Sequence, residues 1–377
     1  AGQYAAGASY SIFMGNSAGI NATSASSSIF LGAGAGADAA GAFGSVFLGA
    51  SYSSFGVLGA GTSATNAVFS NFIGSGAGAN ATNATASNFI GFNAGYNAID
   101  ALSSNFFGAG AGNGATSASF SIFIGSGANP LSSGVGYGAT NADHSIFLGS
   151  EDTDDGLSGA AGEGATDAYL SNFIGASAGA GATNAQYSNF IGVGAGYQAE
   201  EAGDSNFIGD YAGNGATSAY LSNFFGTNAG QNATSASNSI FIGFNSGKND
   251  IVDNTNDNDD YSILFGPNTS TSGFSNSIAL GGYATNTATN QLVIGSDTRN
   301  ISSVFIGGGQ DGSSTDNTLF IGVNAGQYAT SASNSIFMGN NAGINSTSAS
   351  NSNFFGLSAG DSATYAYDSN FLGLNAG

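Results

Sequence analysis

The stretch Ser70–Ala86, SNFIGSGAGANATNATA, decides the fold because its pattern returns along most of the chain every 17 residues. The shared pattern is Ser-Asn-Phe-Ile-Gly-x-x-Ala-Gly-x-x-Ala-Thr-x-Ala-x-x. Its phenylalanine recurs at Phe72, Phe89, Phe106, Phe123, Phe173, Phe190, Phe207, Phe224, Phe241, Phe320, Phe337, Phe354 and Phe371. A period this short and strict indicates that each unit is one coil of a solenoid, which buries a core only against its neighbours.

Each unit is predicted to contain short strands joined by tight turns. Ser-Asn-Phe-Ile carries residues that favour a strand, and Ala81–Ala84 is a candidate second strand, which together predict a flattened two-sheet roll. Gly74 and Ala77-Gly78 mark turns in which positive φ is tolerated. We therefore predict an all-β fold, a parallel β-roll or β-solenoid of about 22 short coils, mostly of 17 residues. At about 4.8 Å per coil this is a rod on the order of 100 Å long.

The rhythm of the repeat divides the chain into sections of one continuous solenoid. Inserted residues lengthen the coils near Phe147 and Phe173, and the intervals shorten between Leu264 and Phe320. The sections are 1–127 (regular), 128–172 (inserted loops), 173–243 (regular), 244–319 (an acidic insertion and coils of 12–15 residues) and 320–377 (regular). The chain begins and ends within a repeat, so we expect a segment of a longer protein.

The charge composition excludes several kinds of partner. Two Lys or Arg residues stand against 23 Asp or Glu, which gives a net charge of −21. Because phosphate binding needs a basic face, we expect no nucleic acid partner and no binding to an anionic membrane surface. No apolar run reaches the roughly 18 residues that predict a membrane span. The chain has no cysteine and hence neither a disulfide nor a Cys-based metal site.

Adjacent apolar residues in each strand predict self-association. Neighbouring side chains of a strand point to opposite faces, so one member of each pair enters the coil and the other leaves it. The core or interchain pairs are Phe72 and Ile73, Phe89 and Ile90, Phe190 and Ile191, and Phe337 and Met338. A monomer would expose an apolar stripe larger than soluble monomers tolerate. We therefore expect identical chains to cover it, in a homotrimeric rod with a Phe-lined axis or in a dimer.

Two polar positions also form columns. The residue before the phenylalanine is often asparagine, as at Asn71, Asn88 and Asn105, and stacked asparagines form amide ladders. One threonine recurs at Thr23, Thr65, Thr82, Thr116, Thr140, Thr183, Thr217, Thr234, Thr330, Thr347 and Thr364. Three interpretations of this column stay open: a structural hydroxyl ladder, a row of O-glycan sites, or an ice-binding face.

Clustered carboxylates make two loops candidate calcium sites. Asp152, Asp154 and Asp155 lie in one loop. Asp253, Asp257 and Asp259 lie in the other. Oxygen-rich, flexible loops suit Ca²⁺, which accepts about six to eight oxygen ligands. The alternative is a pair of solvated acidic loops without metal.

Catalysis is not expected. His144 is the only histidine, and one histidine cannot serve as general base for a whole series of equivalent coils. A tailspike-like glycan hydrolase would need two of the loop carboxylates placed across a sugar. That hydrolase is the remaining alternative to a protein without enzymatic activity.

The irregular stretch resembles a known family. Asn276–Gly281, NSIALG, is followed 14 residues later by Asn290–Gly295, NQLVIG. This stretch, 276–295, resembles the YadA-like head repeat of trimeric autotransporter adhesins, which also occurs in phage tail fibres, and the 17-residue units resemble it loosely. The resemblance implies a left-handed parallel β-roll, a rod of three chains and an adhesive or host-contacting role.

These features predict an extracellular structural fibre shaft, as in a surface filament, an adhesin or a phage tail fibre. The expected partners are further copies of the chain, in trimers or end-to-end filaments, together with a host-cell receptor, surface or glycan. The alternative is a free-standing solenoid that binds glycans or ice through its threonine column. Ca²⁺ is the one predicted cofactor.

Overall fold

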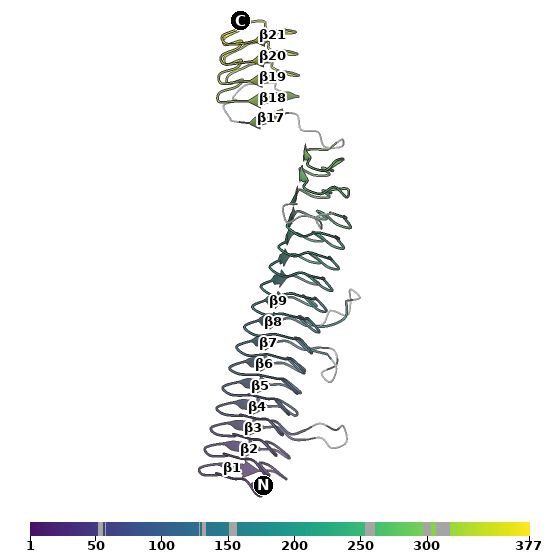
Figure 1. Cartoon of the computed structure of the whole chain (residues 1–377). Helices are drawn as coiled ribbons and strands as arrows, with labels where there is room; N and C mark the ends of the chain where they lie inside the picture. Colours follow the sequence, from purple (N-terminus) through teal and green to yellow (C-terminus); the bar gives the residue numbers. More distant parts are fainter. Residues whose placement is uncertain are drawn as a thin grey trace. The chain divides into compact units, whose positions relative to one another are not determined.

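The computed structural model confirms the predicted fold class, an all-β parallel β-solenoid with one short strand in each coil (Figure 1). The structure describes residues 1–51, 56, 58–127, 129, 133–150, 157–252, 261–296, 303–306 and 317–377, with the backbone alone at 303–306. Within these residues no helix is long and apolar enough to cross a membrane.

The described strands number 21, against about 22 predicted coils, and each carries the Phe-Ile part of the repeat or its equivalent. Their bounds are β1 (Ile12–Met14), β2 (Ile29–Leu31), β3 (Val46–Leu48), β4 (Asn71–Ile73), β5 (Asn88–Ile90), β6 (Asn105–Phe107), β7 (Ile122–Ile124), β8 (Ile146–Leu148), β9 (Asn172–Ile174), β10 (Asn189–Ile191), β11 (Asn206–Ile208), β12 (Asn223–Phe225), β13 (Ser239–Ile242), β14 (Ser262–Phe265), β15 (Ile278–Leu280), β16 (Leu292–Ile294), β17 (Ser303–Ile306), β18 (Thr318–Ile321), β19 (Ile336–Met338), β20 (Asn353–Phe355) and β21 (Asn370–Leu372).

The chain divides into two compact units, Ala1–Val293 and Ile294–Gly377. Strands β1 to β16 form one sheet and β17 to β21 form another, each in sequence order. Strand pairing is parallel and keeps the repeat in register, so that Phe72 pairs with Phe89 and Ile73 with Ile90. At about 4.8 Å per strand, the 16-stranded sheet is on the order of 70 Å long.

The phenylalanine column is the core of the coils. Phe72 and Phe89 are fully buried, and their rings stack with centroids 5.0 Å apart and planes 6° from parallel. Similar stacking continues from Phe13 to Phe147 and from Phe173 to Phe241; between Phe147 and Phe173 the rings meet edge-on. Buried alanines close the coil around the rings. The sequence left open whether Phe72 or Ile73 faces the interior of the coil; the structure places Phe72 inside, so the phenylalanine column does not line an axis between chains.

The part of each coil that lies opposite the strand, here called the return segment, includes residues such as Ala81–Ala84. It does not form a second strand, so the predicted two-sheet roll is wrong. Within Ala81–Ala84 the chain bends at Thr82 and Asn83, and only Thr234, Thr330 and Thr347 of the threonine column form isolated bridges. Asn80 and Asn83 have φ of 58° and 50°, and such left-handed residues bend the chain too often for an extended strand. Successive coils are still hydrogen-bonded there, as where Thr82 N–H donates to the Ala98 carbonyl at 2.9 Å.

The predicted glycine turns are confirmed, and the phenylalanine column adds a second reason for them. Gly74 and Gly78 have φ of 125° and 59°. A Cβ atom on Gly78 would lie 2.3 Å from Cδ1 of the Phe72 ring. Glycine is therefore required at Gly78 both for the left-handed backbone and for the ring that packs on it.

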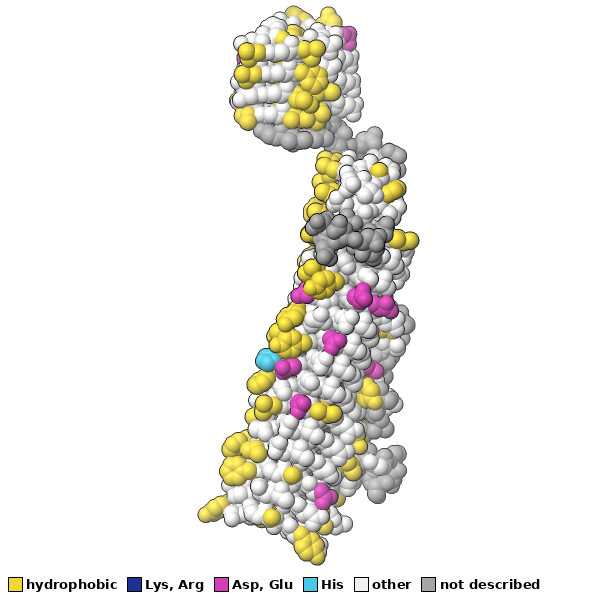
Figure 2. Space-filling model, viewed as in Figure 1, with side chains coloured by type: hydrophobic (Ala, Val, Ile, Leu, Met, Phe, Trp, Pro, Cys, Tyr) yellow, Lys and Arg dark blue, Asp and Glu magenta, His cyan; other side chains and the backbone are white. Residues whose placement is uncertain are grey.

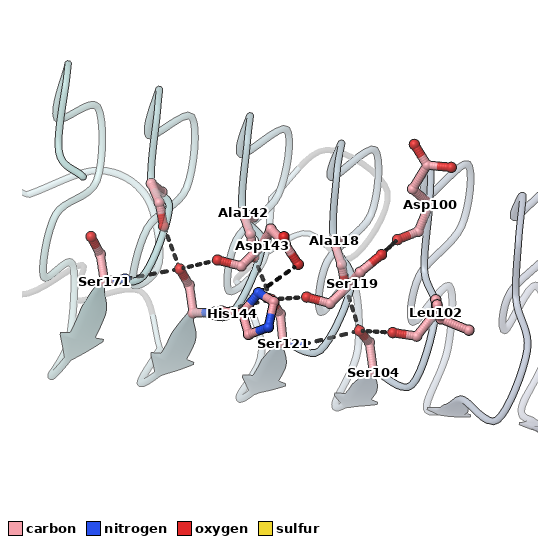
Figure 3. A network of polar contacts seen from close by, with 12 residues as sticks. Asp100, Leu102, Ser104, Ala118, Ser119, Ser121, Ala142, Asp143, His144 and Ser171 are labelled. Atoms are coloured by element: carbon pink, nitrogen blue, oxygen red, sulfur yellow. Dashed lines mark hydrogen bonds and ion pairs between the residues drawn. The ribbon is translucent and has the colours of Figure 1, made fainter. Parts of the chain in front are cut away.

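A column of buried serines, which was not predicted from the sequence, joins the coils. Ser104 Oγ accepts a hydrogen bond from Ser121 N–H at 3.0 Å, and its single hydroxyl hydrogen is shared between the carbonyl oxygens of Leu102 and Ala118 (Figure 3). The serine two positions before the phenylalanine repeats this arrangement in coil after coil. Because this serine recurs at the same position of the repeat, the sequence contained a signal from which the column could have been predicted. The column satisfies backbone groups that the short strands leave inside the coil.

Candidate interaction surfaces

The outward side of the strands, here called the strand face, is the first candidate surface. In β4, Asn71 and Ile73 flank the buried Phe72 and are partly exposed. The residue after the one at the phenylalanine position is apolar in each strand with described side chains: Met14, Leu31, Leu48, Ile73, Ile90, Phe107, Ile124, Leu148, Ile174, Ile191, Ile208, Phe225, Ile242, Phe265, Leu280, Ile294, Ile321, Met338, Phe355 and Leu372. Leu148 is 41% exposed and Ile191 36%. Ile73, Ile90, Ile191 and Met338 are thus the outward members of the predicted pairs.

Amide ladders run beside this apolar column, as predicted. Asn71 Nδ2 donates to Asn88 Oδ1 at 2.8 Å, and Asn88 Nδ2 donates to Asn105 Oδ1 at 2.8 Å. A second ladder runs through Asn172, Asn189, Asn206 and Asn223. None of the 21 strands contains Asp, Glu, Lys or Arg. The strand face is therefore apolar or amide-bearing in a chain of high negative charge.

The predicted calcium ligands Asp152, Asp154, Asp155, Asp253, Asp257 and Asp259 lie outside the described residues. In the described part of the chain, no group of three or more His, Cys, Asp or Glu side chains is arranged to hold a metal ion. Asp250, beside the second loop, is buried and accepts hydrogen bonds from the backbone N–H and the hydroxyl of Thr271. The Asp250 carboxylate is therefore used in hydrogen bonds that link one coil to the next.

A shallow depression on the return segments, here called the polar groove, is the second candidate surface. It consists of two adjoining hollows of about 570 and 430 Å³, which share Ser117 and Asp143. One wall is formed by Asn83, Asp100, Ser117, Asn141, Asp167 and Asn184. The other is formed by Thr85, Leu102, Ser119, Asp143, Tyr169 and Gln186. Between the walls runs a column of alanines whose side chains are buried in the core, including Ala142 and Ala168.

A row of rings, here called the aromatic edge, borders the polar groove and comprises Phe120, His144, Tyr169 and Tyr187. The rings of Phe120 and His144 stack with centroids 4.9 Å apart. Tyr169 meets His144 at 6.3 Å and Tyr187 at 5.6 Å, both edge-on. Figure 2 shows apolar side chains along one border of the first unit, with the histidine and carboxylates beside them. His144, the only histidine of the chain, is half-exposed on this edge.

Carboxylates determine the local electrostatics. Asp143 Oδ1 is inaccessible to solvent and lies 3.1 Å from His144 Nδ1, within the distance of an ion pair with a protonated imidazole (Figure 3). Further along the same corner of the coils, a hydrogen bond to Asp204 and the negative charge of that carboxylate raise the pKa of Tyr220 above its usual 10.0. No residue that lines the polar groove is Lys or Arg.

The threonine column contacts the backbone of neighbouring coils. Thr82 Oγ1 accepts a hydrogen bond from Asp100 N–H at 3.2 Å, and Thr23 Oγ1 accepts one from Gly41 N–H at 3.3 Å. These contacts support the structural interpretation of the column. The O-glycan and ice-binding interpretations stay predictions.

Comparison with protein-family models and with curated proteins finds no match to this chain. The resemblance of 276–295 to the YadA-like head repeat stays a prediction. In the structure this stretch holds β15 and β16, which are neighbours in the 16-stranded sheet.

Proposed function

We propose that this chain forms the shaft of an extracellular fibre by lateral association of identical chains through the strand face. The observation that carries the proposal is the unbroken series of outward apolar side chains along the 16-stranded sheet, in strands that contain no charged residue. An apolar surface of this length exceeds what soluble monomers expose. Burying apolar surface contributes about 25 cal/mol per Å², so even partial cover over many coils favours association.

A second copy of the chain is the partner that fits this surface best. The side chains of the strand face repeat at the spacing of the coils, and the centroids of the rings beneath them are 4.5 to 5.2 Å apart. Another copy has the same spacing and can match it coil by coil. The charge of −21 would oppose association if it were on the interface. The strands are uncharged, so like charges stay outside the contact.

Closed three-fold symmetry is the proposed arrangement, because three parallel rods around an axis cover all three strand faces. The resemblance of 276–295 to a trimeric head repeat supports it. The fibre would serve as a spacer in a surface filament, an adhesin or a phage tail fibre. Only two Lys or Arg residues occur in the chain, so trypsin would find little to cut.

The mass of the purified chain in solution, measured by native mass spectrometry, tests the proposal. We expect a three-chain species for the wild type and a shift to single chains for the double variant Ile191→Asp/Ile208→Asp, which places charges on the strand face. The control is Asn97→Asp/Asn232→Asp, which adds the same charge at exposed left-handed positions of the return segments. A wild type that is monomeric at high concentration would overturn the proposal, as would equal dissociation of both variants.

A further inference from the structure

We propose that the polar groove and its aromatic edge bind an extended, neutral polysaccharide. This site lies on the return segments and comprises residues other than those of the strand face, so it does not depend on self-association. The site also differs from the threonine column, because no threonine of that column lines the polar groove.

The aromatic edge supplies apolar surface where the groove meets solvent. Phe120 and Tyr187 are each 52% exposed, and Tyr169 is 36% exposed and also lines the groove. One face of a pyranose ring presents C–H bonds, and such a face packs on an aromatic ring. Tyrosine combines that apolar surface with a hydroxyl at its tip. The successive edge-on contacts hold these exposed rings in place without a ligand.

The groove walls supply hydrogen-bonding groups for the rim of the sugar. Asp143, Asp167 and Gln186 provide carboxylate and amide groups within one hollow. Asn141 Nδ2 donates to Asp167 Oδ1, and this bond leaves much of the acceptor capacity of that carboxylate for a ligand. Carboxylate and amide side chains that are fixed by neighbours in this way can accept from and donate to vicinal hydroxyl groups. A few well-placed polar groups beside aromatic surface are typical of small-molecule and sugar sites.

Charge and length narrow the ligand class. Asp100, Asp143 and Asp167 lie along the groove, and its lining residues include no Lys or Arg, so sulfated and uronic-acid polymers are disfavoured. The two hollows adjoin and run across successive coils from Asn83 to Gln186. A long, shallow groove of this kind suits a chain of sugars better than a single one.

Affinity electrophoresis of the full chain in gels that contain dextran, mannan, xylan or hydroxyethyl cellulose tests the proposal, with alginate as the anionic comparison. We expect at least one neutral polymer to retard the wild type and alginate to have no effect. Tyr169→Ala and Tyr187→Ala should each weaken the retardation about tenfold, judged from the polymer concentration needed. The matched control is Tyr328→Ala, which removes a tyrosine that is also 52% exposed but lies in the second unit.

Asp143→Asn provides a second, nearly isosteric variant, and it should also weaken binding. Circular dichroism that matches the wild type excludes misfolding of any of these variants. The proposal is overturned if none of the neutral polymers retards the wild type, if only alginate does, or if the groove variants bind as tightly as Tyr328→Ala. Because the mass of the fibre is measured separately, failure of self-association and failure of sugar binding are distinguishable.

Discussion

Phe106 and Phe107 are neighbours in β6, yet Phe106 is fully buried in the coil whereas Phe107 lies on the strand face. Because the two residues have the same side chain and adjacent backbone positions, comparing their variants distinguishes the effect of burial in the coil from that of exposure on the strand face.

We expect Phe106→Ala to destabilise the coils around β6 by about 3–5 kcal/mol, because it leaves a cavity in the ring stack with Phe89 and Phe123. Phe107→Ala should cost far less in an isolated chain, since its side chain is already partly in solvent. Hydrogen exchange of the amides of β5 to β7 measures the difference. Similar loss of protection in both variants would contradict the assignment of Phe106 to the core.

A second matched pair concerns two glycines with nearly the same backbone. Gly112 and Gly114 have φ of 62° and 69°, so replacing either one by alanine costs a similar backbone free energy. A Cβ atom on Gly112 would lie 2.3 Å from the Phe106 ring, whereas on Gly114 its nearest neighbour would be 3.9 Å away. We expect Gly112→Ala to be less stable than Gly114→Ala by about 1–3 kcal/mol. Equal urea midpoints for the two variants would contradict the prediction, because they would show that the Phe106 ring moves aside for the added methyl group at little cost in free energy.

The buried serine column predicts a local effect on exchange. Ser104→Ala removes the acceptor of Ser121 N–H and leaves that amide without this partner inside the coil. The expected cost is about 1–3 kcal/mol, the penalty of an unsatisfied buried donor. The Ser121 amide should exchange faster, while Ser126→Ala, at an exposed serine, should leave it unchanged. Unaltered exchange in Ser104→Ala would refute the role of the column.

Tyr220 gives a prediction about pH. Its pKa is raised by Asp204, so the interaction stabilises the folded chain below pH 10.0 and is lost as pH rises through the higher folded pKa. Asp204→Asn should return the pKa of Tyr220 toward 10.0. Ultraviolet titration, with Tyr220→Phe subtracted to isolate this phenol, measures the change. Identical titration of Tyr220 with and without the Asp204 carboxylate would count against the contact.

Several features of the fold could be predicted from the sequence because they depend on periodicity alone. The phenylalanine register, the parallel stacking, the turns at Gly74 and Gly78 and the ladder through Asn71 and Asn88 all follow from one unit being repeated. A residue that returns at the same place in every coil must stack on its own copies. The absence of charge from the strands is likewise visible in the sequence.

Only the tertiary structure decided which way each side chain points and what it meets. Alternation places Phe72 and Ile73 on opposite faces, but it does not say which face is inside; the alanines and glycines that close around the ring decide that. Left-handed residues such as Asn80 and Asn83 turn the return segment out of the extended conformation. The polar groove was not predictable for a similar reason. It joins Asp143, Asp167 and Gln186 from successive coils across a floor whose shape depends on where the chain bends.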